Sequence, residues 1–212
     1  MGMAMAELQH ESKTRLLDAT LRVVRTKGYT ATRIEDVCAE AGVTKGSFFH
    51  HFKSKEDLAL AAAAHWQANV TEFFGAAPYH ELSDPRDRLI AYIDFRKSIL
   101  TGELPEFTCF AGTIIQETYR THPDVSAACE RSIAGHARTI EAEILAAMRK
   151  YRMRGHWTAE SLALHIQAVI QGSFILAKAK GDAAVAVDCL DHLRRYIKLL
   201  FRGSDERRSR DK

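Results

Sequence analysis

Proline is scarce in this chain of 212 residues, which contains only Pro78, Pro85, Pro105 and Pro123. Proline breaks helices, so the long stretches between these four residues are free to be helical. Ala, Leu, Ile, Arg and Glu dominate those stretches, and most of them favour helices. No stretch alternates apolar and polar residues between turn residues, as a half-buried strand would. The sequence therefore predicts an all-α fold of about nine helices.

Cysteine is also rare, and its four positions lie far apart at Cys38, Cys109, Cys129 and Cys189, without a CxxC pair. Zinc sites use short cysteine spacings, and disulfide frameworks belong to small secreted domains. We therefore expect free thiols in a reducing compartment and no bound metal.

Catalytic motifs are missing as well. The chain lacks HExxH, GxSxG and a glycine-rich phosphate loop. A carboxylate-bridged metal site in a helical bundle repeats an ExxH pair, whereas Glu7 to His10 is a single match. We expect no catalytic residue, no cofactor and no enzymatic activity, with a helical enzyme as the less favoured alternative.

The N-terminus has neither a basic region nor an apolar core typical of a signal peptide. We identify residues 58–64 as the longest uncharged apolar run, far short of the roughly 20 residues of a membrane span. The net charge is +3, so any surface that binds nucleic acid must be a local patch. We expect a soluble cytoplasmic protein with no membrane partner.

Helix boundaries follow from capping residues, glycines and apolar spacing. The expected helices cover residues 12–27, 32–41, 45–52, 54–74, 83–100, 108–120, 124–151, 158–180 and 182–203. Residues 204–212 lack an apolar anchor and are predicted to be disordered.

Two short helices joined by a glycine turn have the layout of a helix-turn-helix DNA-binding domain, although helix pairs of this kind also occur as plain packing motifs. Thr32 is expected to cap the first of them with Glu35 completing a capping box, and Thr44 is expected to cap the second. In the second helix, Phe48 and Phe52 are spaced to enter the core. Its first turn is small and polar, which suits entry into a major groove. Residues 44–55 contain three lysines and no acidic residue, so this face is locally positive.

The stretch TRIEDVCAEAGVTKGSFFHHFKSKEDL resembles the DNA-binding signature of TetR-type regulators along nearly its whole length. The resemblance implies a set of DNA-contacting positions. These are Thr32, Arg33, Thr44, Lys45, Gly46, Ser47, Phe49, His50 and Lys55. Phe49 stands where many members have a tyrosine whose hydroxyl meets a phosphate.

The rest of the chain matches this family in helix order. We expect a DNA-binding domain in residues 1–58, a regulatory and dimerisation domain in residues 59–203 and the tail after it. The last two helices each carry an apolar stripe. These stripes are either buried within one chain or packed against a second copy in a four-helix bundle. The resemblance favours a homodimer through Leu162, Ile166, Val169, Leu190, Leu193 and Ile197.

The middle helices carry many aromatic residues, which pack a core in most proteins. The resemblance implies that they enclose a cavity for a small-molecule effector. The predicted lining is Phe95, Cys109, Phe110, Ile114, His136, Ile140, Gln171 and Phe174. Cys109 begins an expected helix, where the helix dipole favours a reactive thiolate. It is either a sensor thiol or a small buried apolar residue.

These features predict a dimeric transcriptional regulator that binds a palindromic double-stranded DNA operator. By resemblance, it represses transcription until an effector releases it. The alternative with the same fold is a helical DNA-binding adaptor that takes no ligand.

Overall fold

The computed structural model describes residues 2–153 and 156–210, with side chains described for 10–153 and 156–201. Within these residues the chain forms ten α-helices, one 3-10 turn and no strand, which confirms the all-α prediction. The N-terminal helices are α1 (Gly2–Lys27), α2 (Ile34–Ala41), α3 (Lys45–His51) and α4 (Lys55–Gly75). The others are η1 (Pro78–Glu81), α5 (Pro85–Ser98), α6 (Leu104–Phe107), α7 (Phe110–Thr118), α8 (Pro123–Lys150), α9 (Ala159–Lys180) and α10 (Ala184–Arg210). The additional helix relative to the prediction is the four-residue α6.

The chain divides into two compact units. Unit 1 comprises Met1–Thr71 and Thr108–Ser132, and unit 2 comprises Glu72–Phe107 and Ile133–Lys212. This division differs from the expected boundary after residue 58, because α4 continues as one helix through that point. The assignment of separate DNA-binding and regulatory functions to 1–58 and 59–203 stays a prediction.

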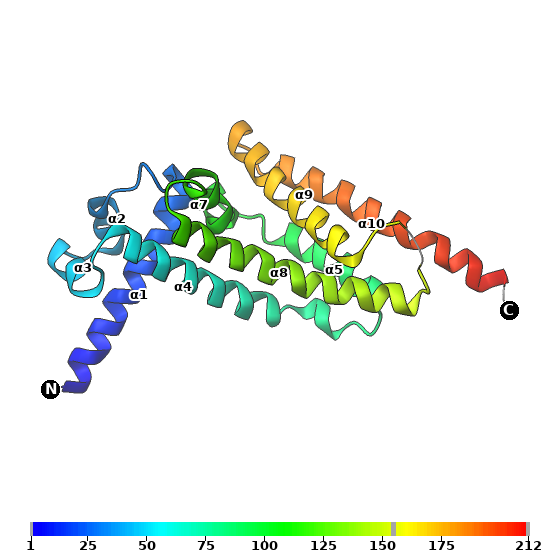
Figure 1. Cartoon of the computed structure of the whole chain (residues 1–212), viewed down its shortest axis with the longest axis horizontal. Helices are drawn as coiled ribbons and strands as arrows, with labels where there is room; N and C mark the ends of the chain where they lie inside the picture. The colour runs from blue at the N-terminus through cyan, green and yellow to red at the C-terminus, as the bar shows by residue number, and fades with distance from the viewer. Residues whose placement is uncertain (1, 154–155, 211–212) are drawn as a thin grey trace. The chain divides into compact units, whose positions relative to one another are not determined.

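Unit 1 is built around α1, which packs against α2, α3 and α7 (Figure 1). Its core contains large side chains that are at most 2% exposed, including Leu16, Val37, Phe48 and Leu58. Side chains spaced three and four residues apart on α1 form the stripe that these helices cover.

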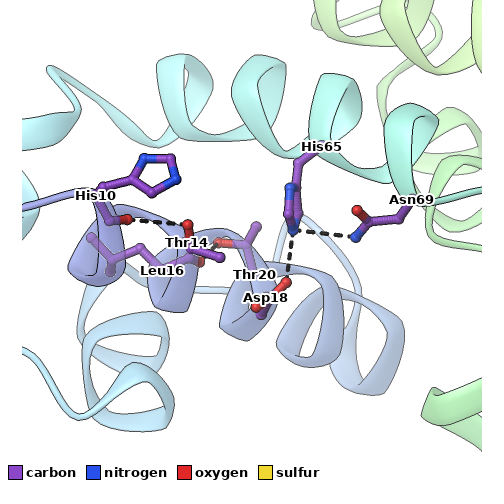
Figure 2. A network of polar contacts seen from close by, with 7 residues as sticks. All are labelled: His10, Thr14, Leu16, Asp18, Thr20, His65 and Asn69. Atoms are coloured by element: carbon purple, nitrogen blue, oxygen red, sulfur yellow. Dashed lines mark hydrogen bonds and ion pairs between the residues drawn. The ribbon is translucent and has the colours of Figure 1, made fainter. Parts of the chain in front are cut away.

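A polar contact also joins α1 to α4. Figure 2 shows His65 of α4 reaching Asp18 of α1, with 2.7 Å between Nε2 and Oδ1. Asn69, one turn further along α4, lies 3.2 Å from the same ring nitrogen. These three side chains link α4 to α1 through an exposed polar contact.

The first and last helices are longer than predicted. The backbone of α1 begins at Gly2 rather than near Ser12, and that of α10 continues to Arg210. Residues 204–210 therefore have a helical backbone although we predicted disorder, because Glu and Arg in this segment are themselves good helix formers. Residues 211–212 lie outside the described part of the chain.

Unit 2 contains α5 and the last two helices. In Figure 1, α9 and α10 lie side by side, and α10 also packs against α5. Two ion pairs join α5 to α10: Lys97 with Asp191 at 2.5 Å and Arg194 with Asp94 at 2.8 Å.

Helix α9 carries a longer uncharged stretch than the run at 58–64. Residues 161–177 contain no acidic or basic residue apart from His165. Within the described residues, α9 is the one helix that is long and apolar enough to cross a membrane, a criterion that core helices of soluble proteins also meet. Its buried residues include Leu162, Ile166 and Ile170, which are each at most 4% exposed.

Candidate DNA interface and regulatory core

The turn between α2 and α3 closes on a glycine. Gly42 has φ +63°, a left-handed conformation that glycine adopts without strain, and its N–H donates to the carbonyl of Ala39 at 3.2 Å. The N–H of Val43 donates to the carbonyl of Cys38 at 3.0 Å. The Thr44 hydroxyl accepts from the N–H of Ser47 at 3.2 Å, which confirms the predicted cap of α3.

The predicted cap of α2 is wrong by one residue. Arg33 is the N-cap, and its N–H donates to Oδ2 of Asp36 at 2.8 Å. Thr32 instead donates its hydroxyl to the carbonyl of Gly28 at 2.6 Å and is 4% exposed. The side chain is buried in the turn after α1. We therefore expect that Thr32 could contact DNA only through its backbone.

The first turn of α3 is open to solvent. Lys45, Gly46, Phe49 and His50 are exposed, with Phe49 at 57%, whereas Ser47 is half-buried. Phe48 and Phe52 anchor the opposite face at 0% and 2% exposure, as their spacing predicted. One face of α3 is therefore open to solvent, and Phe48 and Phe52 hold its other face in the core.

Lys45 has a partner inside the motif. Its Nζ forms an ion pair with Oε1 of Glu35 on α2, and this hydrogen bond lowers the pKa of the Glu35 carboxyl. Both side chains are 56% exposed, so the pair is weakly held and Lys45 can exchange Glu35 for another anion.

Lys55 lies in a small cluster at the end of α1. Its Nζ donates to the carbonyl of Thr30 at 3.3 Å and lies 4.4 Å from the ring centroid of Tyr29. Partial burial lowers the pKa of Lys55, and the Glu117 carboxylate opposes that effect. The ammonium is thus positioned by the protein rather than free in solvent.

Glu117 of α7 is a residue that the sequence analysis missed. Its carboxylate accepts from the backbone N–H of Tyr29 at 3.1 Å and of Thr30 at 2.7 Å. The side chain therefore ties α7 to the turn that precedes α2. A separation of 87 residues leaves no local pattern from which this contact could be predicted.

His51, at the end of α3, also has a partner within unit 1. Its Nε2 lies 2.7 Å from the hydroxyl of Ser12, and burial is the main cause that lowers the pKa of its imidazole. This contact joins the end of α3 to α1.

The predicted dimer residues lie inside the chain. Leu162, Ile166, Leu190, Leu193 and Ile197 are 0–4% exposed, and Val169 is half-buried. They are buried because α9 and α10 pack against each other. Other apolar side chains of these two helices remain exposed: Leu164 at 53%, Ile175 at 49%, Leu176 at 48%, Tyr196 at 44% and Leu199 at 60%.

The predicted effector residues fall into both units. Cys109, Phe110 and Ile114 belong to unit 1, where Cys109 caps α7 and its Sγ accepts from the N–H of Gly112 at 3.3 Å. Phe110 packs beside Trp66 with 6.1 Å between ring centroids. The cysteine thus lies at the helix start, as predicted.

Unit 2 contains the remaining predicted effector residues, namely Phe95, His136, Ile140, Gln171 and Phe174. His136 is 9% exposed, and its Nε2 lies 3.0 Å from the hydroxyl of Tyr92. Burial lowers the pKa of His136 to about 3, so its ring is neutral at physiological pH. Phe174 packs beside Phe107 with 6.1 Å between ring centroids. Which of these residues contact an effector stays a prediction.

Among the residues whose side chains are described, no group of three His, Cys, Asp or Glu side chains is arranged to hold a metal ion.

Two family models match the chain. The model described as "Bacterial regulatory proteins, tetR family" matches residues 16–62, which include the α2–turn–α3 motif. The model described as "Tetracyclin repressor-like, C-terminal domain" matches residues 85–193.

Individual proteins show the same likeness. The uncharacterized HTH-type transcriptional regulator YerO of Bacillus subtilis is 40% identical over 57 residues, or 27% of this chain and 20% of that protein. An uncharacterized HTH-type transcriptional regulator in the lacX 3' region of Lactococcus lactis is 28% identical over 189 residues, covering 86% of this chain and 91% of the relative. A TetR transcriptional regulator from Chloroflexus aurantiacus superposes with a TM-score of 0.77 at 27% identity, covering 91% of this chain and 96% of that structure.

Proposed function

The chain belongs to the TetR family of transcriptional regulators, and from this premise we propose that it represses transcription by occupying a palindromic operator as a homodimer. A small-molecule effector bound among the helices that follow the DNA-binding motif releases it from the operator. Repression follows from occupancy, because an operator that overlaps a promoter is blocked by any protein bound there. We propose no catalytic step, and we place the protein in the cytoplasm with the DNA that it binds.

The observation that carries the proposal is the exposed first turn of α3. Lys45, Gly46 and Ser47 begin the helix, and Gly46 adds no side chain that would hold the helix away from the bases. Lysine can donate to guanine acceptors or to phosphates, and serine can donate or accept. The proposed DNA-facing set is Arg33, Thr44, Lys45, Gly46, Ser47, Phe49, His50 and Lys55.

A dimer gives this surface its specificity. Two recognition helices must reach successive major grooves about 34 to 36 Å apart, so a two-fold dimer fits a palindromic site. We propose that the partner packs against the exposed apolar residues of α9 and α10 rather than against the buried stripes. Leu164, Ile175 and Leu199 are each about half exposed or more, and a partner that covers them would remove this apolar surface from water.

The test is binding to the DNA that flanks the gene of this protein. Fluorescence anisotropy with duplexes tiled across that region, at fixed salt, should find one segment bound far more tightly than an unrelated duplex of equal length. Addition of a library of apolar compounds should then lower the affinity for that segment.

Two results would count against the proposal in different ways. Equal affinity for all duplexes would contradict sequence-specific regulation. Specific binding that no compound in the library weakens would favour the DNA-binding adaptor that takes no ligand.

A further inference from the structure

The basic residues of α5 differ in their partners. Arg88 binds Glu143 with 2.8 Å between Nε and Oε2, Lys97 binds Asp191, and Arg86 lies 3.5 Å from Asp87. Arg96 is the fourth basic residue of the helix. Among the side chains that the structure describes, it has no carboxylate partner.

Aromatic rings surround Arg96 instead. Its guanidinium carbon lies 4.4 Å from the centroid of Phe74 and 5.6 Å from that of Tyr92. Its Nε donates to the hydroxyl of Tyr92 at 3.0 Å. This bond uses one of the five N–H groups of the guanidinium. The two terminal nitrogens, which can bind a carboxylate as a fork, have no hydrogen-bond partner among the described residues.

Among the described side chains, the polar groups linked to Arg96 by hydrogen bonds are uncharged. The Tyr92 hydroxyl accepts from Nε of Arg96 and lies 3.0 Å from Nε2 of His136, whose ring is neutral because burial lowers its pKa. A guanidinium beside neutral groups and aromatic rings is incompletely compensated, and an anion is the group that completes it.

An apolar surface adjoins this cation. The rings of Phe73 and Phe95 lie 5.4 Å apart, and Phe95 also contacts Phe74 at 5.7 Å. Phe73 is 49% exposed, while Phe95 and Arg96 are half-buried, so a molecule from solvent can reach all three side chains. Of these residues, only Phe95 was in the predicted effector set.

We propose that Arg96 binds the carboxylate of an apolar effector whose hydrocarbon part packs on Phe73 and Phe95. This rests on the proposed function, because it names the chemical class of the molecule that would release the operator. The charge of the ligand supplies the missing partner of Arg96, and its apolar part removes exposed aromatic surface from water.

Calorimetric titration without DNA tests this directly. The probes are benzoate, 2-naphthoate, octanoate and dodecanoate, each paired with its primary amide, which has the same shape but no charge. We expect at least one carboxylate to bind the wild type about tenfold or more tightly than its amide, as a charge-assisted hydrogen bond implies. Whether the aryl or the alkyl acids bind separates a flat aromatic effector from an acyl chain.

Arg96→Gln should abolish the preference for the carboxylate and leave the amide affinity within about threefold. The matched control is Arg138→Gln, which removes the same charge from an exposed position of α8 in unit 2. Should Arg96→Gln lower the thermal stability, Arg96→Lys provides a second variant that keeps the charge and loses the fork, and it should bind the carboxylate with intermediate affinity.

The proposal is overturned if none of the carboxylates binds the wild type at millimolar concentration, or if Arg96→Gln retains the preference. Both outcomes are read without operator DNA. Specific operator binding can therefore be observed while the carboxylate site fails, and carboxylate binding can be observed while no operator is found.

Discussion

Lys45 is the charged side chain at the start of α3, and its ion pair with Glu35 is half exposed. Replacing Lys45 by Ala should weaken operator binding by about 1 to 3 kcal/mol, because a base or phosphate contact is lost while no buried group is disturbed. Fluorescence anisotropy at matched salt measures the effect. Lys180→Ala, at the exposed end of α9, should leave the affinity unchanged. Unaltered affinity in Lys45→Ala would remove this residue from the interface.

A substitution of Gly46, in the same turn, tests DNA binding without removing a charge. A Cβ at this position would meet only the hydroxyl of Thr44, at an ordinary 3.7 Å, so Gly46→Leu should fold normally. Bulk here would nevertheless hold α3 away from the groove, and binding should fall further than in Lys45→Ala. An unfolding midpoint equal to that of the wild type, together with lost binding, is the expected pair of results.

His136 makes the stability of the chain depend on pH. Its pKa is about 3 in the folded chain and about 6.5 when unfolded. Between these values the unfolded chain binds the extra proton, so the stabilisation is present above pH 6.5 and is lost as the pH falls. From pH 7.5 to 5 the free energy of unfolding should drop by about 2 kcal/mol more in the wild type than in His136→Gln. Urea denaturation at the two pH values measures this difference, and equal losses in both proteins would contradict it.

At the scale of elements, Glu117 determines how α7 is attached to the turn after α1. Glu117→Ala removes the acceptor of two backbone N–H groups and should lower the free energy of unfolding by roughly 1 to 3 kcal/mol. Gly28→Ala should also destabilise, since Gly28 has φ +86° and an added Cβ would collide with the Glu117 carboxylate.

A double-mutant cycle separates these two causes. In the Glu117→Ala background the collision is gone, so Gly28→Ala should cost less than it does in the wild type. Chemical denaturation of the four proteins measures the coupling. Additive effects would mean that the carboxylate does not approach Gly28 in solution.

At the scale of the whole molecule, the assembly should depend on exposed residues of α9. Leu164→Glu together with Ile175→Glu should convert the dimer to a monomer, because each places a charge in the proposed interface. Sedimentation at micromolar concentration tests this. Leu145→Glu, on the 40% exposed Leu145 of α8, is the matched control and should remain dimeric. Leu193→Glu has a different expected result: it should unfold the chain, since Leu193 is 3% exposed.

The sequence by itself determined the features that depend on neighbouring residues. The all-α class, the Gly42 turn, the Thr44 cap and the Phe48 and Phe52 anchors were all predicted, because caps, turns and helix spacing act over about four residues. The resemblance over residues 32–58 identified the family for the same reason, since its signature is one contiguous segment. The predicted cap at Thr32 was wrong because two adjacent starting positions, Thr32 and Arg33, each have an acidic residue three positions later.

Only the tertiary structure decided which of several apolar faces is buried. The stripe of Leu162, Leu190 and Leu193 fits a dimer interface or an internal core equally well by spacing, and the packing of α9 on α10 makes it core. The contacts of Glu117 with Tyr29 and Thr30, and the lack of a carboxylate beside Arg96 among the described side chains, arise between residues far apart in the chain. Helical spacing predicts which residues share one face of a helix. It does not predict what covers that face, because the covering element depends on how helices that are distant in sequence pack together.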